Sequence, residues 1–385
     1  MPIYDAIVIG GGPAGCSTTI TLQQQGWKVA LLEAKKYPHH KVCGEFLSPE
    51  CTYLLDQLGV TETLCAANPK VIDTVCITAA DDTRWEAHLP GQALGISRYM
   101  LDAIMAAHAA QSGAELHEST TATAIAGNIR DGFEVRARNS KGEHSFSGRL
   151  VIGAHGKRSN LDRALRRRFL QKSQPYIGLK AHFNGPPLPG RIELHTFRGG
   201  YCGMSEIEDG SINLCLLAQK SALHSSENQT DIASFIRWMS NQNPHLGHWL
   251  TDASIVSERW LSISEVPFIA KRPVVNEVLM VGDASGLIAP LAGDGIALAL
   301  HSGLIAGNFA SKFLCGEISG DRLPDEYASI WRNEFQSRLR LSWMLQPLMF
   351  TPALSSSVLK IIRTAPPLGD YLIRKTRDMR LVWNE

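Results

Sequence analysis

Six consecutive small residues near the start of the chain have the types and spacing that bind a diphosphate. The segment Gly10-Gly11-Gly12-Pro13-Ala14-Gly15 is a G-x-G-x-x-G pattern that follows an expected strand, Tyr4 to Ile9, and opens an expected helix. Gly10 permits a tight turn, Gly12 lets the backbone approach a phosphate, and Gly15 lets helix and strand pack closely. The free N–H groups of the helix N-terminus then face the anion with a partial positive charge.

An acidic residue completes this pattern. Glu33 closes the second expected strand, 18 residues after Gly15, where a carboxylate can accept from ribose hydroxyls. Strand, glycines, helix, strand and terminal acid together indicate a bound dinucleotide rather than a glycine-rich turn without a ligand. The pattern alone does not separate FAD from NAD.

A second glycine-rich turn, VGDASGLIAPLAGDGI at residues 281–296, follows a buried strand late in the chain. Asp283 can bind a ribityl or ribose hydroxyl, and the amides of residues 293–296 can face an electron-accepting ring where negative charge develops. The alternative is a second tight turn in which Asp283 caps a helix. The segment closely resembles the G-D-A-x-G-x-x-x-P-x-x-G-x-G-I sequence of flavoprotein monooxygenases and geranylgeranyl reductases. This resemblance makes FAD the expected cofactor.

Two further segments resemble the same flavoproteins. Arg98-Tyr99-Met100-Leu101-Asp102 is similar to the R-x-x-L-D of flavin hydroxylases, in which the arginine faces the cofactor. The alternative is a surface arginine that caps a helix with Asp102. Residues 153–159, GAHGKRS, resemble the G-A-D-G-x-x-S stretch, with His155 where aspartate is usual. In aromatic hydroxylases that Asp-Gly pair is associated with FAD and NADPH, so this departure concerns the nicotinamide step rather than FAD.

The segment KVCGEFLSP, residues 41–49, contains the candidate catalytic residues. Geranylgeranyl reductases and related flavoproteins have a similar P/K-x-C-G-x-x-L-S segment beside the isoalloxazine ring. Cys43 is therefore either redox-active or a small residue that packs on the ring. Glu45 is an acid/base or substrate-binding group, or else a solvated loop carboxylate.

Together these segments resemble the p-hydroxybenzoate-hydroxylase-like flavoproteins, nearest the geranylgeranyl-reductase branch. The W-x-W-x-I-P signature of flavin-dependent halogenases is missing, and residues 199–205 lack the Trp and Phe-Pro of the prenyl-reductase Y-x-W-x-F-P stretch. The resemblance implies an FAD-dependent monooxygenase that takes hydride from transiently bound NADPH or NADH and oxidises an aromatic, polyketide-like or lipophilic small molecule in secondary metabolism. The alternatives are an FAD-dependent reductase of carbon–carbon double bonds and a non-catalytic flavin or nucleotide sensor.

We therefore expect two sets of functional residues. The candidate catalytic residues are Cys43 and Glu45, and His39, His40, His182 and His195 are given no catalytic role. Cofactor contacts are expected from Gly10, Gly12, Pro13, Ala14, Gly15, Glu33, Ala34, Cys43, Gly44, Arg98, Thr123, Gly156, Asp283, Pro290, Gly293, Asp294, Gly295 and Ile296.

The elements that must position these residues predict an α/β fold, with a discontinuous Rossmann-type FAD-binding domain and an inserted sheet-rich substrate domain. The opening is a βαβ unit, a helix is expected over residues 98–111, and Ile177 to Phe183 alternate as in a strand with one buried face. A buried strand over 274–281 and a helix over 295–314 end this part. We assign residues 1–75, 95–170 and 270–330 to the FAD-binding domain, 76–94 and 171–269 to the substrate domain, and 331–385 to a helical C-terminal segment.

Composition narrows the class of protein. The chain has 385 residues, a net charge of +1 and eight cysteines without a C-x-x-C pair, so neither a nucleic-acid partner nor a metal site is expected. A cytoplasmic protein is expected, because no secretory signal or transmembrane segment is apparent. The segment from Arg332 to Glu385 holds nine Lys or Arg and four Asp or Glu among apolar residues. These basic helices either contact a membrane surface or shape the entrance for a lipophilic substrate, or they simply pack on the cofactor domain.

Overall fold

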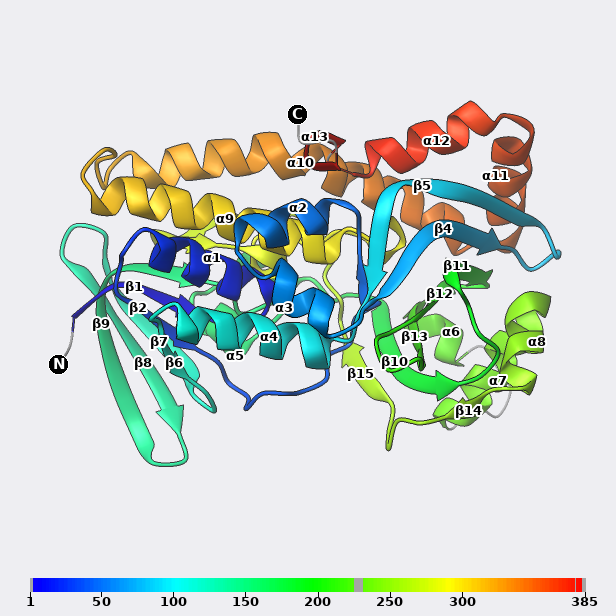
Figure 1. The fold of residues 1–385 in the computed structure, drawn as a ribbon, viewed down its shortest axis with the longest axis horizontal. Helices are drawn as coiled ribbons and strands as arrows, with labels where there is room; N and C mark the ends of the chain where they lie inside the picture. The colour runs from blue at the N-terminus through cyan, green and yellow to red at the C-terminus, as the bar shows by residue number, and fades with distance from the viewer. Residues whose placement is uncertain (1–2, 225–230, 378, 383–385) are drawn as a thin grey trace.

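The chain is built around two β-sheets that lie side by side along the long axis of the molecule, as a computed structural model shows (Figure 1). The structure describes residues 3–224, 231–377 and 379–382. Parts of the three expected units therefore lie outside the described residues: 1–2 of the FAD-binding domain, 225–230 of the substrate domain, and 378 and 383–385 of the C-terminal segment.

The first sheet has the parallel strand order of a dinucleotide-binding fold. Its parallel strands pair in the order β6 (Glu115–His117), β2 (Val29–Leu32), β1 (Ile3–Ile9), β9 (Gly142–Gly153) and β17 (Val278–Met280). Counted along the chain, this is the order 3-2-1-4-5 of a Rossmann fold. β2 and β17 are buried along their whole length and are uniformly apolar, as parallel strands covered on both faces require.

Antiparallel strands extend this sheet. β7 (Thr121–Asn128) and β8 (Gly132–Asn139) pair with the first part of the long strand β9. β16 (Val274–Val275) pairs with β17 at the other edge. The single strand expected over 274–281 is therefore wrong, because Asn276 and Glu277 turn the chain with φ values of 49° and 61° and produce a hairpin.

Within the described residues the second sheet has nine strands. Its order is β14 (Ser254–Ile255), β10 (Tyr176–Asn184), β13 (Ile212–Gln219), β12 (Gly200–Glu206), β11 (Gly190–Phe197), β4 (Lys70–Thr78), β5 (Arg84–Gly95) and β3 (Phe46–Leu47), with β15 (Leu261–Ser264) also on β10. β5 pairs with β4 on both sides of Pro90, because a bulge opposite residues 72–74 interrupts the register there. How these sheets divide into domains stays a prediction.

The two faces of the second sheet have different coverings. Leu179, Ala181 and Phe183 of β10 are buried with Phe235 and Trp249, from α7 (Ile232–Gln242) and α8 (Pro244–Thr251). The intervening residues Lys180 and His182 point to the opposite face, toward Glu45 in the loop before β3, and they are also buried. The alternation read from the sequence therefore located one buried face of a strand that is buried on both.

The other helices are α1 (Pro13–Gln24), α2 (Glu50–Gln57), α3 (Thr61–Ala66), α4 (Arg98–Gln111), α5 (Asn160–Ala164), α6 (Lys220–His224), α9 (Gly295–Leu314), α10 (Leu323–Met349), α11 (Pro352–Thr364), α12 (Pro366–Lys375) and α13 (Met379–Val382). α9 crosses α1 so closely that a Cβ on Gly303 would lie 2.3 Å from the Ala14 carbonyl oxygen. α10 runs alongside α9, and α11 and α12 cover the far end of the second sheet (Figure 1).

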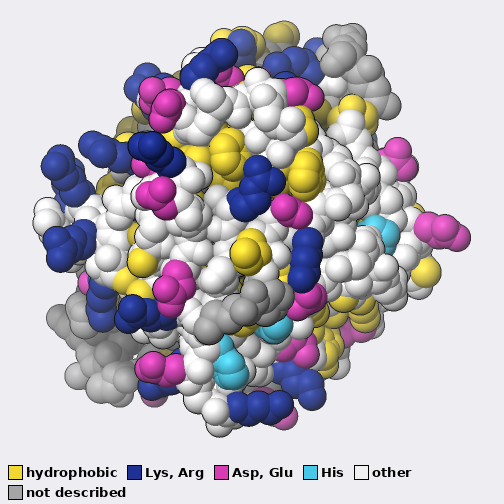
Figure 2. Space-filling model, turned by 90° about the vertical axis from the view of Figure 1, so that its left-hand side faces the viewer, with side chains coloured by type: hydrophobic (Ala, Val, Ile, Leu, Met, Phe, Trp, Pro, Cys, Tyr) yellow, Lys and Arg dark blue, Asp and Glu magenta, His cyan; other side chains and the backbone are white. Residues whose placement is uncertain are grey.

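The expected α/β class, the opening βαβ unit, α4, α9 and the helical C-terminus are confirmed. No described helix combines the length and apolar character needed to cross a bilayer. On the end of the molecule seen in Figure 2, basic and acidic side chains are interspersed, in keeping with the net charge of +1.

Candidate active site

The loops that the sequence assigns to the cofactor meet at one edge of the first sheet, because each follows the carboxyl end of a parallel strand. The Gly10 N–H donates to the Leu32 carbonyl at 2.8 Å, and the Ala154 N–H donates to the Ile9 carbonyl at 2.8 Å. The loop after β17 is joined to the end of β9 in the same way. Segments far apart in the sequence therefore form one continuous edge.

The first glycine turn has a shape that side chains would obstruct. Gly10 has φ +109°, and a Cβ on Gly15 would lie 1.8 Å from the Gly10 carbonyl oxygen, so the helix can approach the strand only without one. Gly12 differs, since a Cβ there would have Arg98 Nη2 at 3.4 Å and Lys41 Nζ at 3.8 Å. Gly12 therefore faces a space that is bordered by two cationic groups.

One carboxylate holds both of these cationic groups. The Arg98 guanidinium donates to Asp102 at 2.6 and 2.7 Å, and the Lys41 ammonium lies 3.3 Å from the same carboxylate. Although burial opposes ionisation, the charges of Arg98 and Lys41 hold the pKa of Asp102 below its ordinary value. Arg98 thus pairs with Asp102 beside the N-terminus of α1 and is not a surface arginine, since its side chain is 13% exposed; its contact with the cofactor stays a prediction. One positive charge remains in excess there for an anion.

Glu33 lies directly behind the first glycine turn. Its carboxylate accepts from the Gly11 N–H at 2.8 Å and from the Lys35 N–H at 3.0 Å. Carboxylate oxygens accept more than one hydrogen bond, so this geometry leaves acceptor capacity for a ribose hydroxyl. The neighbouring Ala34 is exposed.

The second glycine turn, residues 281–296, packs on α1. A Cβ on Gly282 would lie 2.8 Å from that of Ala14, and the Gly282 N–H donates to Ser302 Oγ at 2.8 Å. Further along the same turn, Pro290 and Gly295 are exposed and Gly293 is half-buried. The two glycine turns are therefore neighbours.

Helix α10 holds this second turn, which the sequence did not suggest. The Tyr327 hydroxyl donates to the Met280 carbonyl at 2.7 Å, and Trp331 Nε1 donates to Ser285 Oγ at 3.0 Å. Twelve residues further along the same helix, Trp343 Nε1 donates to the Leu287 carbonyl of this turn at 2.9 Å. The sequence does show aromatic side chains that can donate hydrogen bonds in this helical segment. Their presence alone does not indicate which groups they bind.

Asp294 points away from the turn, because its side chain is fully buried against the C-terminal helices. Arg338 Nη1 donates to it at 3.0 Å, and the Ser48 hydroxyl lies at 3.4 Å. Burial, followed by the charge of Glu50, raises the pKa of Asp294 to about 7 despite the nearby Arg338. Asp294 can therefore reach a cofactor only through its backbone.

The loop before β3 places the two candidate catalytic residues at the junction of the sheets. Gly44 is exposed and a Cβ there would meet nothing within 4 Å, while Cys43 is half-buried. Asn213 Nδ2 on β13 donates to the Cys43 carbonyl at 3.2 Å, and this bond ties the loop to the second sheet. The loop therefore borders open space on one side and the sheet on the other.

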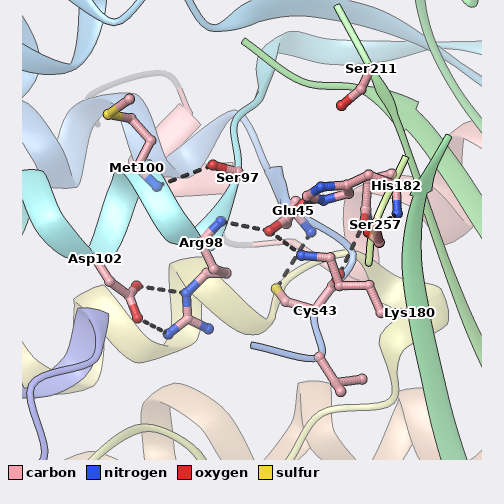
Figure 3. A network of polar contacts seen from close by, with 12 residues as sticks. Cys43, Glu45, Ser97, Arg98, Met100, Asp102, Lys180, His182, Ser211 and Ser257 are labelled. Atoms are coloured by element: carbon pink, nitrogen blue, oxygen red, sulfur yellow. Dashed lines mark hydrogen bonds and ion pairs between the residues drawn. The ribbon is translucent and has the colours of Figure 1, made fainter. Parts of the chain in front are cut away.

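Glu45 is not a solvated loop carboxylate. It is fully buried at φ 55°, and its carboxylate contacts both the Lys180 ammonium and His182 Nε2, the latter at 2.7 Å (Figure 3). The Arg98 N–H at the start of α4 donates to the same carboxylate at 2.7 Å. Burial raises the pKa of Glu45, but the His182 hydrogen bond and the Lys180 charge outweigh it and hold the pKa below its ordinary value. Glu45 is thus an ionised carboxylate that binds two basic side chains.

His40 extends this cluster to the surface. It is exposed, and its ring centroid lies 5.3 Å from that of His182. Burial and the nearby Lys180 lower the pKa of His40. Ligand atoms of His40, Glu45 and His182 lie within 4.8 Å of one another, but the Lys180 ammonium on the same carboxylate would repel a divalent cation. Electrostatics therefore favours a cluster that holds protons, and it contains His40 and His182, two of the histidines that were given no catalytic role.

The sheet face above this cluster changes from polar to apolar. His182, Asn213 and Ser205 are paired across β10, β13 and β12, and buried Tyr201 lies further along β12. The Tyr201 hydroxyl accepts from the Leu291 N–H at 2.9 Å, so the second glycine turn rests on the same face. This face of the second sheet thus has a charged end and an aromatic end.

The remaining expected contacts lie at different distances from this region. Gly156 has φ +82° with open space around its Cβ position, and it follows His155, whose Nε2 is 3.0 Å from Asp162. Ile296 is buried at the start of α9. Thr123 is exposed on β7 and its hydroxyl donates to the Arg136 carbonyl on β8, so it belongs to the hairpin rather than to the joined loops.

These residues fit an FAD molecule. Gly12, Gly44 and Gly156 leave space where a Cβ would stand, and the N-terminus of α1 carries the cations that a diphosphate needs. Such a site defines a nucleotide-binding flavoprotein.

The chain belongs to the family described as having an FAD binding domain, whose model matches residues 3–198. A digeranylgeranylglycerophospholipid reductase of Methanosarcina mazei is 28% identical over 346 residues, 86% of this chain and 81% of that protein. A menaquinone reductase of Mycobacterium tuberculosis is 23% identical over 346 residues, 84% of this chain and 80% of that protein. The structure of the FAD-dependent chondrochloren halogenase of a myxobacterium has a TM-score of 0.79 at 22% identity, over 97% of this chain and 90% of its own, and shows the same fold. The resemblance to hydroxylase-like flavoproteins and geranylgeranyl reductases is confirmed, and the chain is an FAD-dependent oxidoreductase by family.

Proposed function

We propose that this chain is an FAD-dependent reductase of carbon–carbon double bonds in a lipophilic small molecule. The observation that carries this proposal is the buried cluster of Glu45, Lys180 and His182 beside the exposed Gly44. Saturating a double bond requires a hydride and a proton, and a buried ionised carboxylate with two basic partners is suited to holding that proton. Two of the relatives, a phospholipid reductase and a menaquinone reductase, act on lipids with isoprenoid chains, which supports the same substrate class.

The expected cofactor residues of the two glycine turns would hold FAD, with Gly12 and Gly15 at the diphosphate and residues 293–296 at the ring. When bound, FAD would supply a hydride to one carbon of the double bond, and transiently bound NADPH or NADH would restore the reduced cofactor. Lys180 or His182 would donate the proton that the other carbon needs. Glu45 stabilises the cationic donor before the transfer, and solvent restores the proton through the exposed His40.

The second candidate is the FAD-dependent monooxygenase that the motifs implied, acting on an aromatic, polyketide-like or lipophilic substrate. The Arg98–Asp102 pair beside Gly12 favours it, because this segment resembles that of flavin hydroxylases. Oxygen chemistry would use the same FAD site and would need no proton transfer to carbon.

Anaerobic stopped-flow spectroscopy of the NADPH-reduced protein, mixed with candidate lipophilic alkenes, separates these functions. A reductase reoxidises its flavin without O2, and mass spectrometry then finds a product with two more hydrogen atoms. A monooxygenase requires O2 and adds an oxygen atom. A non-catalytic sensor shows no substrate-dependent reoxidation under either condition.

We further propose a membrane-surface contact for α11 and α12 of a cytoplasmic protein. Leu354, Ile361, Leu368 and Tyr371 are between 40% and 54% exposed on these helices. Arg363 and Lys375 are exposed among them, and residues 352–377 hold five basic side chains and one acidic one. Exposed apolar side chains among cations favour the surface of an anionic bilayer.

A further inference from the structure

Two buried cationic side chains lie directly behind the second glycine turn. The Lys271 ammonium donates to the Asp283 carbonyl at 2.7 Å, and the Arg167 guanidinium donates to the carbonyl of the next residue, Ala284, at 2.8 Å. Two consecutive carbonyls of the turn are therefore each held by a different cation.

Lys271 also joins this turn to a second loop. Its ammonium donates to the Lys157 carbonyl at 2.6 Å, immediately after Gly156 in the loop that follows β9. The sequence assigns both loops to the cofactor for separate reasons, and one side chain bridges them. Because β9 and β17 are parallel neighbours, the bridge lies at the same sheet edge as the first glycine turn.

The charges around Lys271 are unevenly balanced. Lys271 is 9% exposed and lies 4.5 Å from the centre of the Phe169 ring, which Arg167 also contacts. Asp162 pairs with Arg167 at 3.0 Å and with His155 at 3.0 Å. Among the residues that the structure describes, no carboxylate oxygen lies within 4.0 Å of the Lys271 ammonium.

These surroundings make the protonation of Lys271 sensitive to added charge. Burial, together with the charges of Arg167 and Lys157, lowers the pKa of Lys271 to about 7, against the opposing effect of Asp283 and Asp162. A negative ligand at this edge favours the protonated form, because an anion near a cation raises its pKa.

We propose that Lys271 is a positioning residue for FAD, which holds residues 157 and 283 in their binding arrangement and takes up a proton when the FAD diphosphate binds. Arg167 is its permanently charged counterpart and holds residue 284. The inference rests on FAD binding at the two glycine turns and adds the origin of its pH dependence. The proton comes from solvent, and it remains on the Lys271 amine for as long as FAD is bound.

The coupling of FAD binding to proton uptake determines whether FAD affinity rises or falls with pH. Above pH 7 the amine is mostly neutral before FAD binds, so binding must recruit a proton and the affinity falls as pH rises. Uptake of one full proton lowers the affinity tenfold for each pH unit. We expect a fall of about threefold to tenfold between pH 7.5 and 8.5, since uptake of half a proton to one proton is reached in this window.

Titration calorimetry of the apoprotein with FAD tests this, in phosphate and in Tris at pH 8, because the two buffers differ in ionisation enthalpy and the difference in heat counts the protons taken up. The wild type should take up about half a proton to one proton. Lys271→Arg keeps the charge at all these pH values, and it should bind FAD without uptake and without the pH dependence. Lys271→Met should bind FAD more weakly, also without uptake, while Lys141→Met, which changes an exposed lysine in the β8–β9 turn, should behave as the wild type.

Wild-type binding of FAD without proton uptake, or undiminished uptake in Lys271→Arg, would overturn the role of Lys271 while leaving the FAD site intact. Failure of the wild type to bind FAD at all would instead overturn the proposed function. If Lys271→Met does not fold, the Lys271→Arg comparison decides by itself, because that variant keeps a cation in place.

Discussion

Glu45 and Lys180 form an ion pair in which both partners are buried, since 0% of the Glu45 side chain and 2% of the Lys180 side chain are exposed. Glu45 directly precedes β3 and Lys180 lies on β10, so the pair joins opposite ends of the second sheet across 135 residues of sequence. Burying two charges costs several kcal/mol each unless both are fully paired, so a protein keeps such a pair for specificity or chemistry more readily than for stability. Its position next to Cys43 and Gly44 connects the pair to the proposed ring site.

Neutralising Glu45 should therefore affect stability and chemistry together. Glu45→Gln leaves Lys180 buried without its counter-charge, and we expect a loss of about 3 kcal/mol in the free energy of unfolding. The rate at which an alkene substrate reoxidises the reduced flavin should fall by about 100-fold or more, since general acid catalysis contributes this much. Denaturant unfolding and stopped-flow absorbance measure the two effects.

The double variant Glu45→Gln/Lys180→Met provides the control. It removes both charges, so it should recover most of the lost stability, while substrate-dependent reoxidation stays slow. Reoxidation at the wild-type rate in this double variant would show that the cluster has a structural role only.

The two glycines of the first turn should respond differently to the same substitution. Gly12→Val places its side chain in the space expected for the diphosphate, where the nearest protein atoms are side-chain ends at 3.4 and 3.8 Å. We expect a folded protein that is purified without flavin. Gly15→Val should not fold, because its Cβ would lie 1.8 Å from a backbone oxygen.

Flavin absorbance and circular dichroism of the purified variants check this contrast. Normal flavin content in a folded Gly12→Val protein would contradict the placement of the diphosphate at this turn.

Helix α10 should contribute to FAD affinity at a distance from the cofactor. Trp331→Phe removes the hydrogen bond to Ser285 and leaves a buried hydroxyl with one partner fewer. We expect FAD to bind about fivefold more weakly, which corresponds to about 1 kcal/mol for one buried hydrogen bond. Trp238→Phe on α7 is the matched control, since it packs on the far face of the second sheet. Quenching of flavin fluorescence measures both affinities, and equal effects of the two substitutions would argue against a specific role of α10.

The parts of the site that could be predicted are those whose physics is local. The turns at residues 10–15 and 281–296 can be recognised in the sequence because glycine spacing, a preceding strand and a following helix lie within one short segment. By contrast, Lys180 and His182 were read as the outward face of a one-sided strand, and no local signal places Glu45 against them.

Other features depended on partners that only the fold supplies. The direction of Asp294 is fixed by Arg338, 44 residues further along the chain. The hairpin at Asn276 and Glu277 was missed because glutamate at positive φ is unusual, so the pair did not read as a turn. The bridge made by Lys271 links carbonyl groups, which carry no sequence signature.

The basic helices α11 and α12 lead to a prediction about lipid binding. Arg363 and Lys375 are exposed near Ile361 and Tyr371, so they can approach lipid phosphates as the apolar side chains enter the interface. Lys360 is less suited to this, because its ammonium is 2.7 Å from Asp81. The double variant Arg363→Glu/Lys375→Glu should bind vesicles of phosphatidylglycerol and phosphatidylcholine at least about 30-fold more weakly than the wild type, at about 1 kcal/mol for each cation lost.

The matched control reverses Arg130 and Lys141, two exposed cations at the turns of the β7–β8–β9 hairpins. These turns lie at the opposite end of the molecule from α11 and α12 (Figure 1), so Arg130→Glu/Lys141→Glu should leave vesicle binding unchanged although it changes the net charge equally. Vesicle sedimentation in low and high salt measures all three proteins, and binding of the wild type should weaken as salt screens the lipid charge. Equal loss in both double variants would mean that net charge alone attracts the protein to the bilayer, and α11 and α12 would then have no special place in lipid binding.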